Sequence, residues 1–131
     1  MKILSCLLVL LFLSGCVTSR LATSIGEDIG YSFQKASAKG EISAEQSIKA
    51  WPYISGLVRG ILAEDYDYKV SPSIQHVMDV LDEIAQQDVL SSEDKGKVIG
   101  SYVRLEYMFG KELWDKYGIS FVGAVKTFLA R

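Results

Sequence analysis

The sequence predicts an all-α fold, a compact bundle of about five helices, and three observations carry this prediction. Apolar residues recur every three or four positions in five separate stretches, which is the period of an amphipathic helix. Most of these stretches are bounded by helix-capping residues or by glycine. Between the turn signals, no stretch alternates apolar and polar residues, so we expect no β-strand.

The first helix is expected to begin at Ser24. The tetrapeptide Ser24-Ile25-Gly26-Glu27 has the pattern of a capping box, in which the side chains at the two ends satisfy backbone N–H groups. Its apolar face contains Leu21, Ile25, Ile29, Phe33 and Ala36. We expect the helix to end at Lys39-Gly40, because glycine readily adopts the left-handed conformation of a helix C-cap.

A second capping box, Ser43-Ala44-Glu45-Gln46, is expected to open the next helix. The apolar face of that helix contains Ala44, Ile48, Trp51, Ile54, Val58, Ile61 and Leu62. Pro52 lies within this pattern and cannot donate a backbone hydrogen bond. Because the apolar residues keep their phase across Pro52, we expect a kink there and not a break.

Residues 64–70 lose the helical period and are predicted to form a loop. Ser71-Pro72 then restarts a helix, with serine as the cap and proline in the first turn, where its missing N–H costs nothing. The predicted buried face of this third helix contains Ile74, Val77, Met78, Leu81, Ile84 and Ala85.

The fourth helix is the longest that we expect, and Ser91-Ser92-Glu93-Asp94 is predicted to cap its start. Its apolar residues are Val98, Ile99, Tyr102, Val103, Met108, Phe109, Leu113 and Tyr117. Lys116 and Gly118 are expected to end it. A short final helix contains Phe121, Val122, Val125, Phe128 and Leu129.

The N-terminus has the layout of a secretory signal peptide: Met1-Lys2, then an apolar run that ends at Leu13-Ser14-Gly15-Cys16. These last four residues resemble the lipobox of bacterial lipoproteins. The resemblance implies cleavage before Cys16, a diacylglycerol on its thiol and acylation of the new amino group. An uncleaved membrane helix is disfavoured, since residues 3–13 are too few to span about 30 Å of hydrocarbon. A plain signal that leaves Cys16 free is the other alternative.

The expected organisation is therefore a signal peptide over residues 1–15, a lipidated N-terminus with a short tether over residues 16–23, and one helical domain over residues 24–131. Residues 17–23 reach only about 25 Å when fully extended, which keeps the domain near the membrane surface. Val17, not aspartate, follows Cys16. By analogy with enterobacterial lipoprotein sorting, this indicates transfer to the outer membrane, on its periplasmic face.

Charge and cysteine content exclude several classes of protein. Removal of the signal takes away one basic residue, Lys2, and leaves 13 basic and 16 acidic residues. That balance excludes a strongly basic nucleic-acid-binding protein. Cys6 leaves with the signal and Cys16 is acylated, so no thiol remains for a disulfide, a zinc site or a nucleophile. The core must therefore rest on aliphatic residues, Trp51, Trp114 and the seven tyrosines.

The sequence contains little material for catalysis, and we do not expect an enzyme. His76 is the only histidine, and no G-x-S-x-G motif accompanies it. Asp82 and Glu83 are adjacent, so a helix points them about 100° apart and they form a poor acid–base pair. Haem ligation by His76 with Met78 or Met108 on a facing helix remains an alternative. Apart from the lipid on Cys16 we expect no cofactor.

A calcium loop starting at Asp65 is disfavoured, because position 6 of the loop is Val70 instead of glycine and position 12 is His76. The charges are nevertheless unevenly distributed. Residues 64–94 contain nine acidic residues and one basic residue, whereas residues 95–131 contain seven basic and three acidic residues. Either the acidic segment packs beside the basic one within the fold, which we favour, or it attracts a basic partner.

The binding surface expected from the sequence contains the loop residues Glu64, Asp65, Tyr66, Asp67 and Tyr68, since exposed tyrosines are common in interfaces. The glycine pairs Gly26/Gly30 and Gly56/Gly60 are each spaced by four on a predicted helix. Such spacing allows two helices to approach closely. A groove for a partner helix at Gly56/Gly60 is the alternative interpretation.

These observations predict an outer-membrane lipoprotein that binds another envelope protein, anchored at Cys16. Its outline is similar to the helical pilotins, which escort channel subunits to the outer membrane, and to surface-exclusion lipoproteins, which occupy an envelope receptor. The alternative is a helical bundle that carries a small apolar ligand or haem. No nucleic-acid partner is expected.

Overall fold

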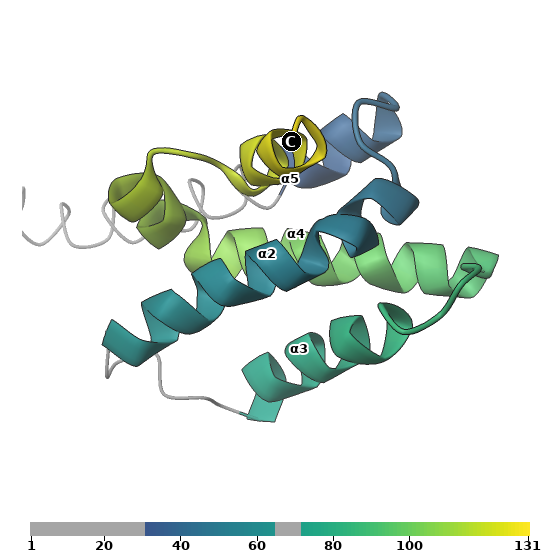
Figure 1. The fold of residues 1–131 in the computed structure, drawn as a ribbon, viewed down its shortest axis with the longest axis horizontal. Coiled ribbons are helices and arrows are strands. Elements are labelled where there is room, and N and C mark those ends of the chain that lie inside the picture. The colour runs from purple at the N-terminus through teal and green to yellow at the C-terminus, as the bar shows by residue number, and fades with distance from the viewer. Residues whose placement is uncertain (1–30, 65–71) are drawn as a thin grey trace, which may run out of the picture.

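Five helical segments make up the part of the chain that the computed structural model describes, residues 31–64 and 72–131 (Figure 1). They are the segment 31–38, α2 (Ala44–Glu64), α3 (Pro72–Ile84), α4 (Ser92–Tyr117) and α5 (Phe121–Leu129). No strand occurs within these ranges. The expected all-α bundle of about five helices is confirmed. The predicted signal peptide, the tether and the cap at Ser24 lie outside the described residues.

Serine side chains cap the helix starts as the sequence predicts. At α2 the backbone N–H of Gln46 donates to Ser43 Oγ at 3.1 Å, and the N–H of Ser43 donates to Gln46 Oε1 at 2.8 Å, which completes the capping box. At α4 the N–H of Asp94 donates to Ser91 Oγ at 3.1 Å. Ser120 caps α5 in the same way through the N–H of Gly123, a cap that the sequence analysis missed.

Replacing Ser91 with alanine is expected to lower the free energy of unfolding by about 1 kcal/mol, because one backbone N–H at the start of α4 loses its acceptor. Chemical denaturation followed by far-UV circular dichroism measures the change. Ser92→Ala is the matched control, since Ser92 is exposed and is the first residue of α4. Equal losses for both variants would contradict the capping role of Ser91.

Two glycines end helices in the left-handed conformation, as expected. Gly40 has φ +75°, and the N–H of Glu41 donates to the carbonyl of Ala36 at 2.9 Å, which is the hydrogen bond of a Schellman motif. Gly118 has φ +67° and donates to the carbonyl of Trp114 at 2.7 Å. Residues with a Cβ rarely adopt this conformation.

α2 continues without a break from Ala44 to Glu64, with Pro52 inside it. Pro52 is exposed, so its ring lies on the solvent side of the helix, away from the core. The carbonyl four residues before it, at Ile48, lacks the usual N–H partner. The continuity agrees with our expectation that no break occurs, and the kink stays a prediction.

α2 and α4 form the centre of the bundle and pack most extensively against each other. α3 lies on one side of this pair, whereas α5 lies on the other, with the segment 31–38 beside it (Figure 1). The core between them contains almost all of the predicted apolar positions that are described. Chief among them are Phe33, Trp51, Ile54, Val58, Met78, Leu81, Val98, Tyr102, Phe109, Leu113 and Phe121.

Tyr102 of α4 lies at the middle of this core and is fully buried. Its ring stacks on Phe33, with centroids 5.0 Å apart and planes 9° from parallel. Trp51 and Phe121 meet the same ring edge-on at 6.1 and 6.4 Å. The Tyr102 hydroxyl donates to the backbone carbonyl of Ser47 at 2.7 Å. One side chain therefore joins four of the five helical segments.

Some predicted core residues are exposed. Trp114 is 60% exposed, because it lies on the outer face of α4, and Tyr117 is also exposed at the end of that helix. Ala85 is exposed because α3 ends at Ile84 and the chain turns away. In the opposite direction, Leu105 is fully buried, although the sequence analysis did not place it in the core.

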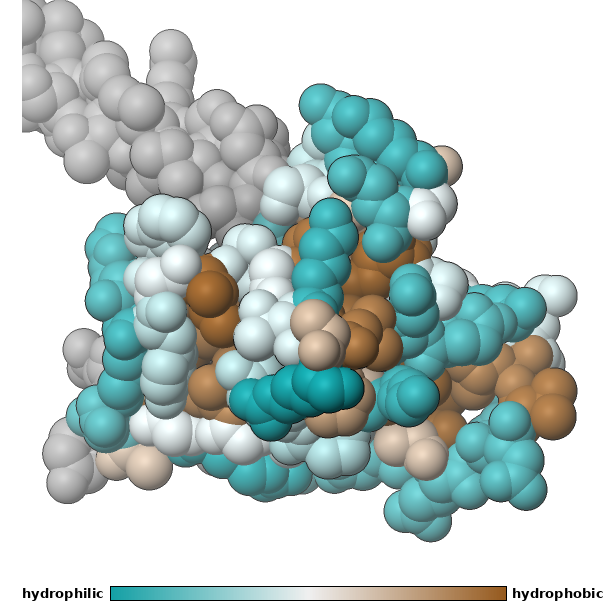
Figure 2. Space-filling view, turned by 45° about the horizontal axis from the view of Figure 1, so that its top comes forward, coloured by the Kyte–Doolittle hydropathy of each residue, from teal (hydrophilic) through white to brown (hydrophobic). Residues whose placement is uncertain are grey.

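Among the described helices, none combines the length and the apolar character that crossing a membrane requires. On the face of the molecule in Figure 2, small apolar patches alternate with hydrophilic side chains, without one continuous apolar surface.

Candidate functional site

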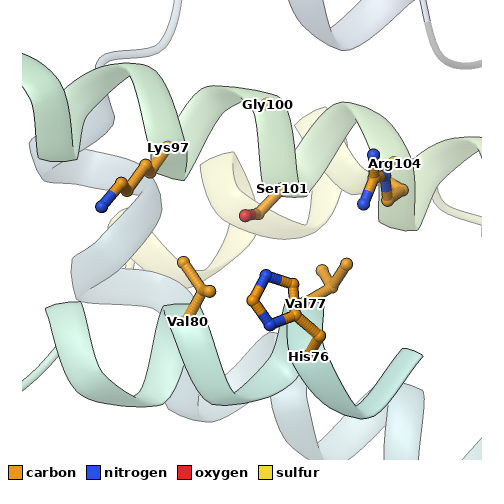
Figure 3. Close-up of a pocket in the computed structure, with 7 residues that line it drawn as sticks. All are labelled: His76, Val77, Val80, Lys97, Gly100, Ser101 and Arg104. Carbon is orange, nitrogen blue, oxygen red and sulfur yellow. The ribbon is translucent and has the colours of Figure 1, made fainter. Parts of the chain in front are cut away.

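The most distinctive surface feature is a groove between α3 and α4, with a volume of about 360 Å³ (Figure 3). We call it the α3–α4 groove. Its lining residues from α3 are His76, Val77 and Val80, and from α4 they are Lys97, Gly100, Ser101 and Arg104. Within each helix the lining residues are one, three, four or seven positions apart, which places each set on one side of its helix.

The polar side chains surround an apolar floor. Lys97 lies at one end of the groove and Arg104 at the other, with the hydroxyl of Ser101 between them on α4 (Figure 3). From α3, Val80 and the imidazole of His76 point toward α4. The described residues that line the groove include no carboxylate. The groove therefore combines apolar contact area with positive charge at both ends.

The two cations are available for a new partner. Lys97 Nζ lies 3.4 Å from Glu93 Oε1 one turn earlier on α4, and both side chains are more than half exposed. Such exposed ion pairs contribute little free energy and exchange readily. Arg104 forms no ion pair with any residue in the described ranges.

Because Gly100 has no side chain, the backbone of α4 is accessible on its side of the groove. Gly100 is exposed, and a Cβ added there would meet no atom within 4 Å. A ligand can consequently approach the backbone of α4 between Lys97 and Arg104. The sequence analysis gave Gly100 no role, because a single glycine in a helix signals such an approach only when a neighbouring element shows the space in front of it.

The chemistry of the α3–α4 groove suits binding better than catalysis. Its lining holds a hydroxyl and an imidazole but no carboxylate to orient the imidazole, as a hydrolytic triad requires. In the described part of the chain, no three histidine, cysteine or acidic side chains are grouped so that they could hold a metal ion. The groove can bind an anionic group together with apolar side chains.

The surface predicted from the sequence lies elsewhere. Glu64 is at the end of α2, where it forms an ion pair with Lys116 of α4. Glu64 and Lys116 also line a second hollow of about 350 Å³ between the ends of α2 and α4, with Ile61, Glu112 and Asp115. Asp65, Tyr66, Asp67 and Tyr68 lie outside the described residues, as does Cys16.

The two glycines of the predicted helix groove differ in their surroundings. Gly56 is exposed and nothing lies within 4 Å of an added Cβ, so no neighbouring helix approaches it closely. Gly60 faces the hydroxyl of Tyr117 of α4, 3.2 Å from an added Cβ. The described part of α2 therefore contains no close helix crossing at Gly56, and Gly26/Gly30 lie outside the described residues.

Several carboxylates of the acidic segment have partners within the fold. Asp82 of α3 accepts a hydrogen bond from Trp51 Nε1 at 2.7 Å and lies 3.6 Å from Arg59 of α2. Lys116 pairs with Glu64, as described above. Arg59 lies outside the basic segment 95–131, so of these two ion pairs only Glu64–Lys116 joins the acidic segment to the basic one, as the favoured interpretation expects.

The structure does not bring together the three residues of the haem alternative, because His76 and Met78 lie on different sides of α3 and Met108 lies on α4. His76 is exposed in the α3–α4 groove, whereas Met78 is buried in the core. Met108 is half-buried on α4 and packs against the core. The groove thus brings His76 together with Ser101 and Arg104, and with neither methionine.

Glu106 of α4 is a buried carboxyl group that the sequence analysis did not single out. It is 2% exposed, and its Oε1 accepts a hydrogen bond from the hydroxyl of Ser32 in the segment 31–38. Its Oε2 has no hydrogen-bond partner. Desolvation raises the pKa of Glu106 to about 7, against the smaller lowering effect of the Ser32 hydrogen bond. Glu106 lies outside the α3–α4 groove.

Comparison with known proteins identifies no relative: no family model, no curated protein and no solved structure matches this chain.

Proposed function

We propose that this chain is a lipid-anchored protein of the outer membrane, facing the periplasm, that works by binding another envelope protein through the α3–α4 groove. The observation that carries the proposal is the groove itself, an open depression with a valine floor and a cation at each end. Grooves between helices with this mixture of apolar and charged lining are typical sites for segments of partner proteins.

A protein partner is favoured over a small ligand because the lining is exposed. His76, Lys97, Gly100 and Arg104 are all exposed side by side. Sites for small ligands usually enclose most of the ligand surface, which this groove does not. The carrier of a small apolar ligand or haem remains the alternative function.

The lipid anchor at Cys16 would determine the location at which the chain binds its partner. Lipidation at Cys16 is what the resemblance of Leu13-Ser14-Gly15-Cys16 to a lipobox implies, and transfer to the outer membrane is what Val17 implies by analogy with enterobacterial lipoprotein sorting. A short tether would hold the groove near the membrane surface, where a membrane-embedded partner presents its periplasmic segments. Both a pilotin-like adaptor and a surface-exclusion lipoprotein operate at this location.

Site-specific photocrosslinking in intact cells tests the proposal. A photoreactive amino acid at position 100 is expected to crosslink one envelope protein, and the same amino acid at position 56 is expected to give little of that product. The two positions are matched, since both are exposed helical glycines with open space in front of an added Cβ.

The crosslinked partner, once purified, should bind the full-length chain directly, and the double substitution Lys97→Glu and Arg104→Glu should abolish both binding and crosslinking. A Cys16→Ser form should lose membrane attachment and crosslink less. Crosslinking at position 56 instead of 100 would reject the α3–α4 groove and favour the surface around Gly56. Absence of any crosslinked protein at either position would reject the protein-binding function.

A further inference from the structure

We infer that the α3–α4 groove receives an acidic amphipathic helix of the partner, with two carboxylates two turns apart and apolar side chains between them. The inference rests on the proposed function and specifies the chemistry of the occupant. It is carried by the positions of the cations, the valines and Gly100 in the groove.

The spacing of the cations sets the spacing of the carboxylates. Lys97 and Arg104 are seven residues apart on α4, which is two helical turns or about 10 Å along the helix axis. A helix lying alongside α4 reproduces this distance with acidic residues at positions i and i+7. Carboxylates at i and i+4 are only about 6 Å apart along the axis and reach one cation at a time.

The valines that line the groove determine which side chains of the partner helix can lie between its two carboxylates. Val77 and Val80 of α3 line the groove between its charged ends, and Ser101 offers a hydroxyl opposite them. Apolar side chains at i+3 and i+4 of the incoming helix lie on the same face as i and i+7 and meet these valines. Without a side chain at Gly100, the incoming helix can approach α4 closely.

The positive charge of the groove contrasts with the net negative charge of the chain and favours an acidic partner segment. The protein is acidic, with a formal net charge of −2, yet the described residues that line the groove include two cations and no carboxylate. A basic partner segment would meet like charge at both ends of the groove. An acidic segment replaces the weak Lys97–Glu93 pair and forms an ion pair with Arg104, which has none with the described residues.

Two synthetic helical peptides of identical composition test the inference. One carries glutamates at i and i+7 with leucines at i+3 and i+4. The other exchanges the residues at i+4 and i+7, so that its glutamates stand at i and i+4 and its leucines at i+3 and i+7. Each peptide is labelled with a fluorophore and titrated with the full-length lipidated chain in nanodiscs of neutral lipid, and binding is followed by fluorescence anisotropy. We expect the i/i+7 peptide to bind about tenfold more tightly, because it forms two ion pairs instead of one.

Variants of the chain assign the effect to the groove. Lys97→Gln and Arg104→Gln should each weaken binding of the i/i+7 peptide about five- to tenfold, and added salt should weaken it further. Lys111→Gln is the matched control, because Lys111 is also an exposed lysine of α4 that pairs with an acidic residue one turn away, Asp115. Lys111→Gln should leave binding unchanged.

The outcomes separate this inference from the proposed function. Equal binding of the two peptides, or no binding of either, overturns the inference, while a protein crosslinked at position 100 would still support the proposed function. If Lys97→Gln and Arg104→Gln instead reduce attachment to vesicles that contain phosphatidylglycerol, the groove binds lipid phosphate and the inference is overturned. If position 100 also captures no protein, both fail.

Discussion

Replacing Glu106 with glutamine is expected to stabilise the protein above neutral pH and to remove most of the dependence of its stability on pH between about pH 5 and pH 8. Burial raises the pKa of Glu106 from its ordinary value of 4.5 to about 7 in the folded state. Between these two values the folded chain holds a proton that the unfolded chain has released. Stability therefore falls as the pH rises through this window, and the loss is complete above the folded-state pKa.

The expected size of the effect is about 3 kcal/mol, since the pKa of Glu106 rises from 4.5 to about 7 and a difference of one in pKa corresponds to about 1.4 kcal/mol. Glutamine imitates the protonated carboxyl group. Its amide oxygen can accept the hydrogen bond from the Ser32 hydroxyl, and no charge is left in the core at high pH. The variant should thus keep the low-pH stability of the wild type over the whole range.

Urea denaturation at a series of pH values measures this directly. Glu83→Gln is the control, because it removes the same charge from an exposed position on α3 and should leave the shape of the pH curve unchanged. If the wild type and Glu106→Gln show the same slope between pH 5 and pH 8, the carboxyl group of Glu106 is not held in an apolar environment.

The largest loss of stability is expected for Tyr102→Ala, about 3–5 kcal/mol. The substitution leaves a cavity where the segment 31–38, α2, α4 and α5 meet, and it removes the stacked contact with Phe33 and the edge contacts with Trp51 and Phe121. It also leaves the carbonyl of Ser47 without the hydroxyl that donates to it. A loss of this size approaches the whole stability of many small domains.

Tyr102→Phe keeps the prediction measurable even if Tyr102→Ala does not fold. It preserves the ring and removes only the hydrogen bond to Ser47, so we expect a loss of about 1–2 kcal/mol in the free energy of unfolding by urea denaturation. Tyr107→Ala is the control on the same helix, since Tyr107 is 51% exposed and its loss should change stability by less than about 0.5 kcal/mol. Similar effects at positions 102 and 107 would contradict the central role of Tyr102.

The helices and their ends follow from local chemistry, and the sequence predicted them well. The capping box Ser43–Gln46, the cap at Ser91 and the left-handed glycines at positions 40 and 118 are all present. Each depends on residues within one turn of the chain, which is why sequence reasoning can find them. The apolar period likewise placed Trp51, Leu81 and Phe121 in the core.

The candidate site could not be predicted in the same way. Lys97, Ser101 and Arg104 belong to one helix face, but only the position of α3 beside them shows that this face borders a groove with Val77 and Val80. In the sequence, nothing marks Gly100 or His76 as a residue that lines a groove. The groove depends on how the consecutive helices α3 and α4 pack against each other, and the apolar period within each helix contains no information about that packing.

The burial of Glu106 and the exposure of Trp114 also could not be predicted from the sequence. Periodicity assigns a charged residue to the surface and a tryptophan to the core, yet Glu106 is buried against Ser32 of the segment 31–38, and Trp114 is exposed. Which face of a long helix is covered depends on where the neighbouring helices end. Local pattern thus decided the secondary structure, the caps and most of the core, while helix packing decided the groove, the buried carboxyl group and the pKa that burial imposes on it.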